Sequence, residues 1–218
     1  MKILNLYACL GGNRYKWDEV ANQAGIEIQI TAVEWDEELA RLYKERFPND
    51  TVIIADAHQY LLDHYKEFDF IWSSPPCPTH SRFQTSMKTK RKMSYPDMKL
   101  YEEIILLQHY FDGKYVVENV IPFYEPLIAA QQRNRHIYWS NMILPNIVSN
   151  RKNPDLARTE HLIKALSDFH DYDFTQYKGK QDIKKVARNL VDYEAGRTIF
   201  ETALGIITEH NKQQLKLF

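Results

Sequence analysis

Short apolar segments alternate with amphipathic ones along the first 140 residues. The apolar segments predict β-strands at 3–8, 27–33, 51–55, 68–72, 114–117 and 136–140. The segments between them predict helices at 13–24, 37–47, 56–65, 97–111 and 124–131. Asp36 is a good N-cap, and Gly25 and Pro48 mark helix ends. Strands that alternate with helices at this spacing predict a doubly wound, Rossmann-like α/β sheet.

Polar or reactive residues follow the predicted strands. They are Gly11 and Gly12, Glu34, Asp56, Cys77 and Glu118. In a doubly wound sheet, ligands bind in the crevice outside the carboxyl ends of the strands. The sequence therefore predicts one crevice that gathers all of these residues.

The amino-acid composition of the chain changes after Asn146. Residues 146–195 are polar and aromatic, and the alternation typical of strands is weak there. We predict a core over residues 1–145, a short substrate-facing segment over 146–195, and a C-terminal helix over 196–218 that returns to the core.

Composition narrows the class of protein. Hydrophobic residues make up 44% of the chain, so a buried core can form. The formal net charge of -1 excludes a strongly basic protein that coats nucleic acid. Two cysteines exclude a disulfide scaffold and favour the cytosol, and no segment has the pattern of a signal peptide or membrane span. Residues 71–100 hold six basic side chains and one acidic one. This stretch is either a solvated loop or a phosphate-contacting loop beside a reactive site.

The residues after the second and third strands favour an adenosyl-containing cofactor. The Glu34 carboxylate can accept hydrogen bonds from ribose hydroxyls. Trp35 could stack on an adenine or belong to the core, and Asp56 could hold the adenine amine or cap a helix. The Gly11-Gly12 turn would let the backbone approach a ligand.

Cys77 lies between prolines, which fix the backbone around it and disfavour an inert packing role. As a nucleophile its thiolate would need positive potential, which the stretch from Arg82 to Lys99 and a sulfonium could supply. Glu118, if protonated, could act as a general acid, or it could be a surface residue. Arg133 and Arg135 would point the same way in an extended backbone.

Taken in order, these motifs resemble those of the DNA (cytosine-5) methyltransferase family, as a compact, phage-type member, over about residues 3–140. The similar segments are Tyr7–Gly12, Glu34–Asp36, Asp56, Pro75–Cys77 with Ser81, Glu118–Val120, and Gln131, Arg133 and Arg135. The chain departs from the family pattern in having Asn5 in place of an acidic residue and Cys9 in place of a glycine. The closing Gly-Asn motif is not found, and we expect Gly205 to end the fold in its place.

The resemblance implies an S-adenosylmethionine cofactor, S-adenosylhomocysteine as product, no metal, and duplex DNA with a flipped cytosine as substrate. Residues 146–195 would recognise the DNA target, in a cytoplasmic enzyme of a bacterium or phage-infected cell, in the setting of restriction-modification, without a membrane. Oligomeric state is left open, with a monomer as one option. The implied catalytic residues are Cys77, Glu118, Arg133 and Arg135. The implied cofactor-binding residues are Tyr7, Cys9, Gly11, Gly12, Glu34, Trp35, Asp56 and Pro75. The implied substrate-binding residues are Ser81, Arg82, Lys88, Lys90, Arg91, Asn119 and Gln131.

Two alternatives stay open. One is an RNA cytosine-5 methyltransferase of the same fold that acts on tRNA. The other is a non-catalytic DNA-binding subunit, which Asn5, Cys9 and the missing closing motif favour. The retention of Cys77, Glu118, Arg133 and Arg135 argues against it.

Overall fold

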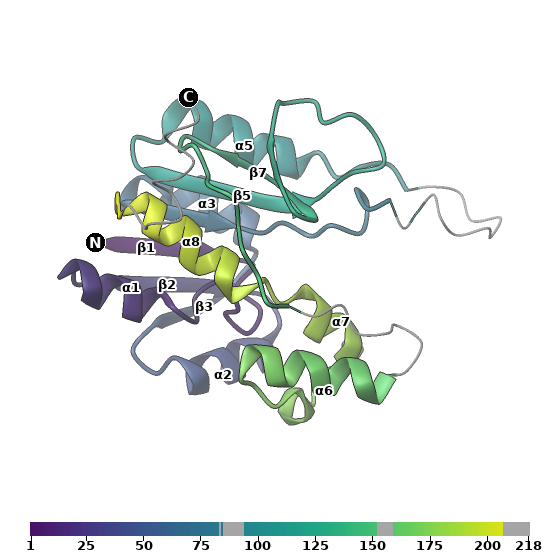
Figure 1. Ribbon diagram of the computed structural model, residues 1–218. Helices are drawn as coiled ribbons and strands as arrows, with labels where there is room; N and C mark the ends of the chain where they lie inside the picture. The colour runs from purple at the N-terminus through teal and green to yellow at the C-terminus, as the bar shows by residue number, and fades with distance from the viewer. Residues whose placement is uncertain (83, 85–93, 152–158, 207–218) are drawn as a thin grey trace.

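A seven-stranded mixed sheet forms the centre of the molecule (Figure 1). The computed structural model describes residues 1–82, 84, 94–151 and 159–206. The strand order is β3-β2-β1-β4-β5-β7-β6, in which β7 runs antiparallel to both of its neighbours. The strands are β1 (Lys2–Leu6), β2 (Gln29–Glu34), β3 (Thr51–Ile54), β4 (Phe70–Ser73), β5 (Lys114–Val120), β6 (Gln131–Arg133) and β7 (His136–Ser140).

Helices cover both faces of this sheet. They are α1 (Trp17–Ala24), α2 (Glu37–Arg46), α3 (Ala57–His64), α5 (Lys99–Tyr110), α6 (Thr159–His170), α7 (Ile183–Asn189) and α8 (Tyr193–Ala203). Because side chains alternate along a strand, Ile3 and Trp72 face α1 and α8, whereas Leu4 and Ile71 face α3 and α5. Figure 1 shows α8 lying beside α1. The prediction of a doubly wound, Rossmann-like α/β sheet is confirmed.

The segment after residue 158 packs against α2 and the first turn of the chain. Leu162, Leu166 and Leu190 share a buried apolar cluster with Leu10 and with residues of α2. Figure 1 shows α6 and α7 together at the α2 end of the molecule. The helix predicted to return to the core begins at Tyr193, so the boundary predicted at residue 195 falls inside α8.

Several local predictions differ from the structure. The helix predicted at 124–131 is wrong, because that segment is irregular and held by side chains: Tyr101 accepts from the Leu127 amide at 3.1 Å, and Trp139 donates to the Ile128 carbonyl at 2.9 Å. Helix α1 begins at Trp17 rather than at residue 13. Strand β5 continues to Val120, beyond its predicted end at Val117.

Buried polar side chains fix the turn between β1 and α1. The Arg14 guanidinium donates to both oxygens of Asp50, at 2.9 and 3.0 Å, and Tyr43 donates to the same carboxylate at 2.8 Å. Asn13 donates to the Asn5 side chain at 2.8 Å. These side-chain hydrogen bonds hold Asn13 and Arg14 in the turn, ahead of the first residue of α1.

Among the helices of the described residues, none combines the length and apolarity that crossing a membrane requires.

Candidate active site

Two adjoining cavities lie at the carboxyl ends of β1, β2 and β4. The first has a volume of about 380 Å³ and the second about 350 Å³. They share five lining residues: Tyr7, Glu34, Trp35, Pro75 and Pro76. The first extends to Asp56 and Leu100, and the second extends to Cys77 and Glu118. The predicted crevice is therefore present as two compartments with a common wall, and Glu34, Asp56, Cys77 and Glu118 line it. Gly11 and Gly12 line neither cavity, because they pack against α2 and the Leu190–Val191 segment.

Trp35 stands at the junction of the two cavities with an open ring face. Its side chain is 71% exposed, so it does not belong to the core. Asp56 does cap α3, because its Oδ1 accepts from the Gln59 amide at 3.1 Å, and its other oxygen lies 3.7 Å from the Lys99 ammonium. It also lines the first cavity, so the two roles considered for it are compatible. An exposed indole beside carboxylates suits an adenine ring with its attached sugar.

Glu34 closes β2 and holds the turn beside the first strand. Its carboxylate accepts backbone hydrogen bonds from Cys9 at 2.8 Å and from Trp35 and Asp36 at 3.0 Å each. Burial raises the pKa of Glu34, while the three amides act in the opposite direction. A carboxylate has room for about four hydrogen bonds, so Glu34 can also accept from a ribose hydroxyl.

The Gly-rich turn has the backbone that a close approach requires. Cys9 has a φ of 48° and Gly11 a φ of 68°, both in the left-handed region that favours glycine. A Cβ at Gly12 would lie 2.2 Å from the Val191 carbonyl oxygen, so this glycine also allows the C-terminal segment to pack on the turn. The Cys9 thiol lines the second cavity near Val186, and burial raises its pKa.

A buried carboxylate under the first cavity was not predicted from the sequence. Glu103 on α5 is fully buried and accepts from Tyr7 at 2.5 Å and from Ser73 at 2.6 Å, and it lies 3.1 Å from the His58 ring. The hydrogen bond with Glu103 raises the pKa of His58, and burial raises the pKa of Tyr7. These contacts fix Tyr7 in the shared wall. The apolar spacing of α5 gave no signal for this role, because Glu103 occupies a core position.

The Cys77 loop is tied to the end of β5. The Asn119 amide donates to the Pro75 carbonyl at 3.0 Å, and the Cys77 carbonyl accepts from the amides of His80 and Ser81, each at 3.0 Å. Ser81 pairs with Pro122 in a β-bridge, and Arg82 donates to the Pro122 carbonyl at 3.1 Å. The structure therefore places Asn119, Ser81 and Arg82 in the framework that holds the loop. Lys88, Lys90 and Arg91 lie outside the described residues.

The electrostatic surroundings of Cys77 differ from the expectation. Burial raises the pKa of the Cys77 thiol, and the Glu118 carboxylate adds to that rise. Among the described residues, the cation that counteracts them is Lys185 on α7. The prediction that the stretch from Arg82 to Lys99 supplies this potential is not supported by its described members, since Arg82 binds a carbonyl and Lys99 faces Asp56.

Glu118 lies inside β5 and lines the second cavity with Cys77. Its Oε1 lies 3.4 Å from Nε2 of His136, the first residue of β7. The side chain of Glu118 is 10% exposed and that of His136 is 30% exposed. Glu118 is thus a buried carboxyl in the cavity rather than a surface residue.

The opposite wall of the second cavity comes from the C-terminal part of the chain. It includes Gln181, Lys185, Arg188 and Asn189, together with Arg151. Sequence reasoning missed these residues because no local motif marks them. They enter the site only because the segment from α6 to α7 folds back over Leu10, more than 150 positions away in the sequence.

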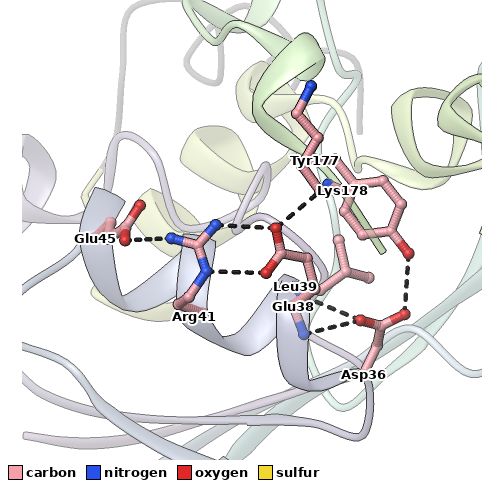
Figure 2. A network of polar contacts seen from close by, with 7 residues as sticks. All are labelled: Asp36, Glu38, Leu39, Arg41, Glu45, Tyr177 and Lys178. Atoms are coloured by element: carbon pink, nitrogen blue, oxygen red, sulfur yellow. Dashed lines mark hydrogen bonds and ion pairs between the residues drawn. The ribbon is translucent and has the colours of Figure 1, made fainter. Parts of the chain in front are cut away.

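The N-terminus of α2 anchors this wall (Figure 2). The Asp36 carboxylate caps the helix by accepting from the amides of Glu38 and Leu39, at 3.0 and 3.1 Å. It also accepts from the Tyr177 hydroxyl at 3.1 Å, as Figure 2 shows. The Gln181 amide, which the figure does not draw, donates to the same carboxylate at 2.8 Å. Burial opposes the charge, but the hydrogen bonds outweigh it and lower the pKa of Asp36. Residues 34–36 thus connect the cavities to the C-terminal segment.

The Gln131–Arg135 motif takes a different shape from the predicted one. Asn134 has a φ of 54°, and it sits with Arg135 in the turn between β6 and β7, so the prediction of one extended backbone is wrong. Gln131 donates to the Met142 carbonyl at 2.7 Å, and Arg133 donates to the Pro145 carbonyl at 2.9 Å. Gln131 and Arg133 therefore hold the 142–145 segment, and Arg135 is exposed.

Among the described residues, no group of three or more histidine, cysteine, aspartate or glutamate side chains is arranged to hold a metal ion.

The sheet order and the cavities at its carboxyl edge define a methyltransferase-like α/β fold. In agreement, the chain is similar to the solved Entamoeba histolytica methyltransferase EhMeth, with 11% identity over 96% of this chain and 99% of that one and a TM-score of 0.55.

Residues 1–126 match the family described as C-5 cytosine-specific DNA methylase, which is more than half of the 218 residues, so the chain belongs to that family. A solved variant of Spodoptera frugiperda DNMT2 is similar at 20% identity, over 72% of this chain and 55% of that one, with a TM-score of 0.41. No curated protein matches the chain.

Proposed function

We propose that the protein is a DNA (cytosine-5) methyltransferase that acts through a transient bond between Cys77 and the cytosine ring. The observation that supports this proposal is that Cys77 and Glu118 line the second cavity together. That cavity adjoins the first one across a wall that includes Trp35 and Glu34. A nucleophile, an acid and a nucleotide-shaped compartment are the parts this reaction needs.

The residues that line the two cavities suit S-adenosylmethionine, which would supply the methyl group. Its adenine would stack on Trp35 and its ribose hydroxyls would hydrogen-bond Glu34 and face Asp56. Its methionine part would extend past Tyr7 and Cys9, which line the second cavity, and the Gly11–Gly12 turn would set the backbone path that places Cys9 there. Pro75, in the shared wall, would separate the cofactor from the Cys77 loop.

The residues of the second cavity would divide the chemistry between them. The Cys77 thiolate adds to C6 of the cytosine, and Glu118 gives a proton to N3, which balances the negative charge that develops on the ring. C5 is thereby made nucleophilic enough to accept the methyl group. Methyl transfer leaves S-adenosylhomocysteine as the other product. A water molecule then takes the C5 proton, N3 returns its proton to Glu118, and the Cys77 thiolate leaves, which restores the aromatic ring and gives 5-methylcytosine.

The target base must leave the duplex to reach Cys77, at a cost of a few kcal/mol in stacking and pairing. Asn119 supports this step indirectly, by holding the Pro75–Cys77 loop. Arg135, exposed at the β6–β7 turn, would contact the flipped nucleotide, while Arg133 and Gln131 support that hairpin. The sequence-based prediction that Ser81, Arg82, Lys88, Lys90 and Arg91 contribute to DNA binding stays part of this proposal, and phosphate contacts of that kind would make binding salt-dependent. Residues 146–195 would carry target recognition.

Incubation with a labelled methyl donor, followed by nucleoside analysis, tests this function. We expect label in 5-methylcytosine from duplex DNA, and none with the Cys77→Ser protein, which should still bind DNA. Label in N4-methylcytosine or N6-methyladenine would refute the proposal, since exocyclic amines need no enzyme thiolate. Label in tRNA alone would support the RNA alternative.

A further inference from the structure

Glu103 is a buried carboxylate on α5 whose partners come from three other elements around the first cavity. Its Oε1 accepts a hydrogen bond from the Tyr7 hydroxyl at 2.5 Å, and its Oε2 accepts one from the Ser73 hydroxyl at 2.6 Å. Nδ1 of His58, on α3, lies 3.1 Å from the same Oε1. Glu103 is fully buried, so bulk water does not compete for these contacts. The carboxylate thus joins the turn after β1, the end of β4 and helix α3 at one point.

The partners of Glu103 form or adjoin the walls of the cavities. Tyr7 lines both cavities, and His58 lines the first. Ser73 is the last residue of β4, and Pro75, two positions further on, lines both cavities. Glu103 itself lines neither of them. Any effect that it has on a bound molecule is therefore exerted through these partners.

Tyr7 has a backbone conformation that needs such support. Its φ is 55°, in the left-handed region that residues with a Cβ seldom adopt. A conformation of this kind persists only where the surrounding structure holds it. The hydroxyl of Tyr7 is bound to a residue 96 positions away in the sequence, so this hydrogen bond ties the turn to α5. Without the bond, some molecules would have a different turn, and a ligand would have to restore it on binding.

We propose that Glu103 is a positioning residue for the cofactor, which acts through the Tyr7 hydroxyl to hold the turn after β1 in the conformation that receives the adenosyl group. This inference rests on the proposed function, which assigns the two cavities to S-adenosylmethionine. Glu103 prepares the wall before the ligand arrives. The affinity is higher as a result, because a ligand that meets an ordered wall does not have to order it.

A carboxylate suits this task better than the apolar residue that its place on α5 would otherwise favour. An ionised carboxylate has about four acceptor positions and no donor, so it can accept from both hydroxyls and from the imidazole at once. Hydrogen bonds to a charged acceptor are also stronger than those to a neutral one. The hydrogen bond with Glu103 raises the pKa of His58, which favours an imidazolium as the partner of the buried charge.

Calorimetric titration with S-adenosylhomocysteine tests this role. Tyr7→Phe removes the hydroxyl and keeps the ring, and it leaves Glu103 with Ser73 and His58, so the fold should be retained. We expect its Kd to be about 10-fold higher than that of the wild type, because the left-handed turn is then held less firmly. Unchanged affinity in Tyr7→Phe would overturn the proposal.

Two substitutions of Glu103 separate a lost hydrogen bond from general damage to the core. Glu103→Gln keeps a carbonyl oxygen for Tyr7, and its amide can donate to Ser73, so it should stay within about threefold of the wild-type affinity. Glu103→Met has a similar length but no oxygen, and it should match the loss in Tyr7→Phe. The double variant Tyr7→Phe with Glu103→Met should show no further loss, because both changes remove the same bond. If Glu103→Gln binds no better than Glu103→Met, the positioning role is refuted. Should Glu103→Met fail to fold, Tyr7→Phe still decides.

Tyr15→Phe is the matched control. The Tyr15 hydroxyl also donates to a carboxylate, that of Asp171, at 2.8 Å, and Tyr15 lines neither cavity. We expect this variant to bind S-adenosylhomocysteine as the wild type does. An equal loss of affinity in Tyr15→Phe and Tyr7→Phe would mean that the effect is not specific to the Glu103 contact, and it would refute the proposal.

The binding results can be told apart from those on the proposed function. If the wild type binds S-adenosylhomocysteine and Tyr7→Phe binds it more weakly, but no cytosine is methylated, the proposed function fails and the role of Glu103 stands. If cytosine is methylated and Tyr7→Phe binds normally, the proposed function stands and the role of Glu103 fails. A wild type that binds no S-adenosylhomocysteine would overturn the role of Glu103, whatever it methylates.

Discussion

Substitution of Asp36 by alanine should break the hydrogen bonds that hold the C-terminal wall of the second cavity against the N-terminus of α2. The change removes the N-cap of α2, which is worth about 1 kcal/mol. It also removes the acceptor of the hydrogen bonds from Tyr177 and Gln181. Each contributes about 0.5–1.5 kcal/mol. The free energy of unfolding should therefore fall by about 2–4 kcal/mol.

Urea unfolding followed by circular dichroism measures this loss. The matched control is Glu38→Ala on the same helix, since Glu38 pairs with Arg41 at the surface and accepts from the Lys178 amide at 3.3 Å (Figure 2). A surface pair contributes about 0–1 kcal/mol. If Asp36→Ala costs no more than Glu38→Ala, Asp36 does not anchor the C-terminal segment.

The same residue gives a pH dependence with a definite sign. The pKa of Asp36 is lowered in the folded protein, so its charge stabilises the fold above the ordinary aspartate value of 3.8. That stability is lost as the pH falls through the lowered pKa. The difference in unfolding free energy between the wild type and Asp36→Asn should therefore be full at pH 7 and should shrink in acid; a difference that grows in acid would contradict this reasoning.

Three further predictions concern single side chains. Alkylation of Cys77 at pH 8, followed by peptide mass spectrometry, should be faster in Glu118→Gln and slower in Lys185→Met, because the carboxylate raises the pKa of the thiol and the ammonium lowers it; the reverse order would refute this account of the thiol. Asp50→Ala should lose about 3–5 kcal/mol of stability in urea, because the buried Arg14 guanidinium then keeps only the largely exposed Asp18 as an anionic partner, and a loss below 1 kcal/mol would contradict it. Trp35→Ala should weaken S-adenosylmethionine binding in calorimetry about 10- to 100-fold through lost stacking, with unchanged stability; unchanged affinity would remove Trp35 from the site.

The sheet could be predicted because short apolar segments mark its strands. Turn residues on either side of each segment show where the strand begins and ends. The prediction failed where tertiary contacts outweigh local pattern. Strand β5 extends through the polar pair Glu118 and Asn119, because both side chains find partners beside the strand. The segment 124–131 has a helix-like composition, but Tyr101 and Trp139 hold its backbone in an irregular path.

The candidate site could be predicted only in part, for a similar reason. Residues that follow strands, such as Glu34 and Cys77, are brought together by the topology of the sheet, which the order of elements already determines. Lys185 reaches the second cavity through the packing of α6 and α7 on α2, and Arg151 is held there by donating to the Leu190 carbonyl at 3.4 Å. Nothing near either residue in the sequence marks that position. Glu103 escaped notice because a buried carboxylate occupies what the spacing identifies as an apolar face.

The most direct test of the proposed chemistry is to incubate the protein with S-adenosylmethionine and duplex DNA that contains 5-fluorocytosine. Fluorine at C5 prevents the loss that releases the enzyme, so a protein–DNA adduct should accumulate, and peptide mapping should place it on Cys77. Turnover of ordinary DNA to 5-methylcytosine with no adduct at Cys77 would contradict the account.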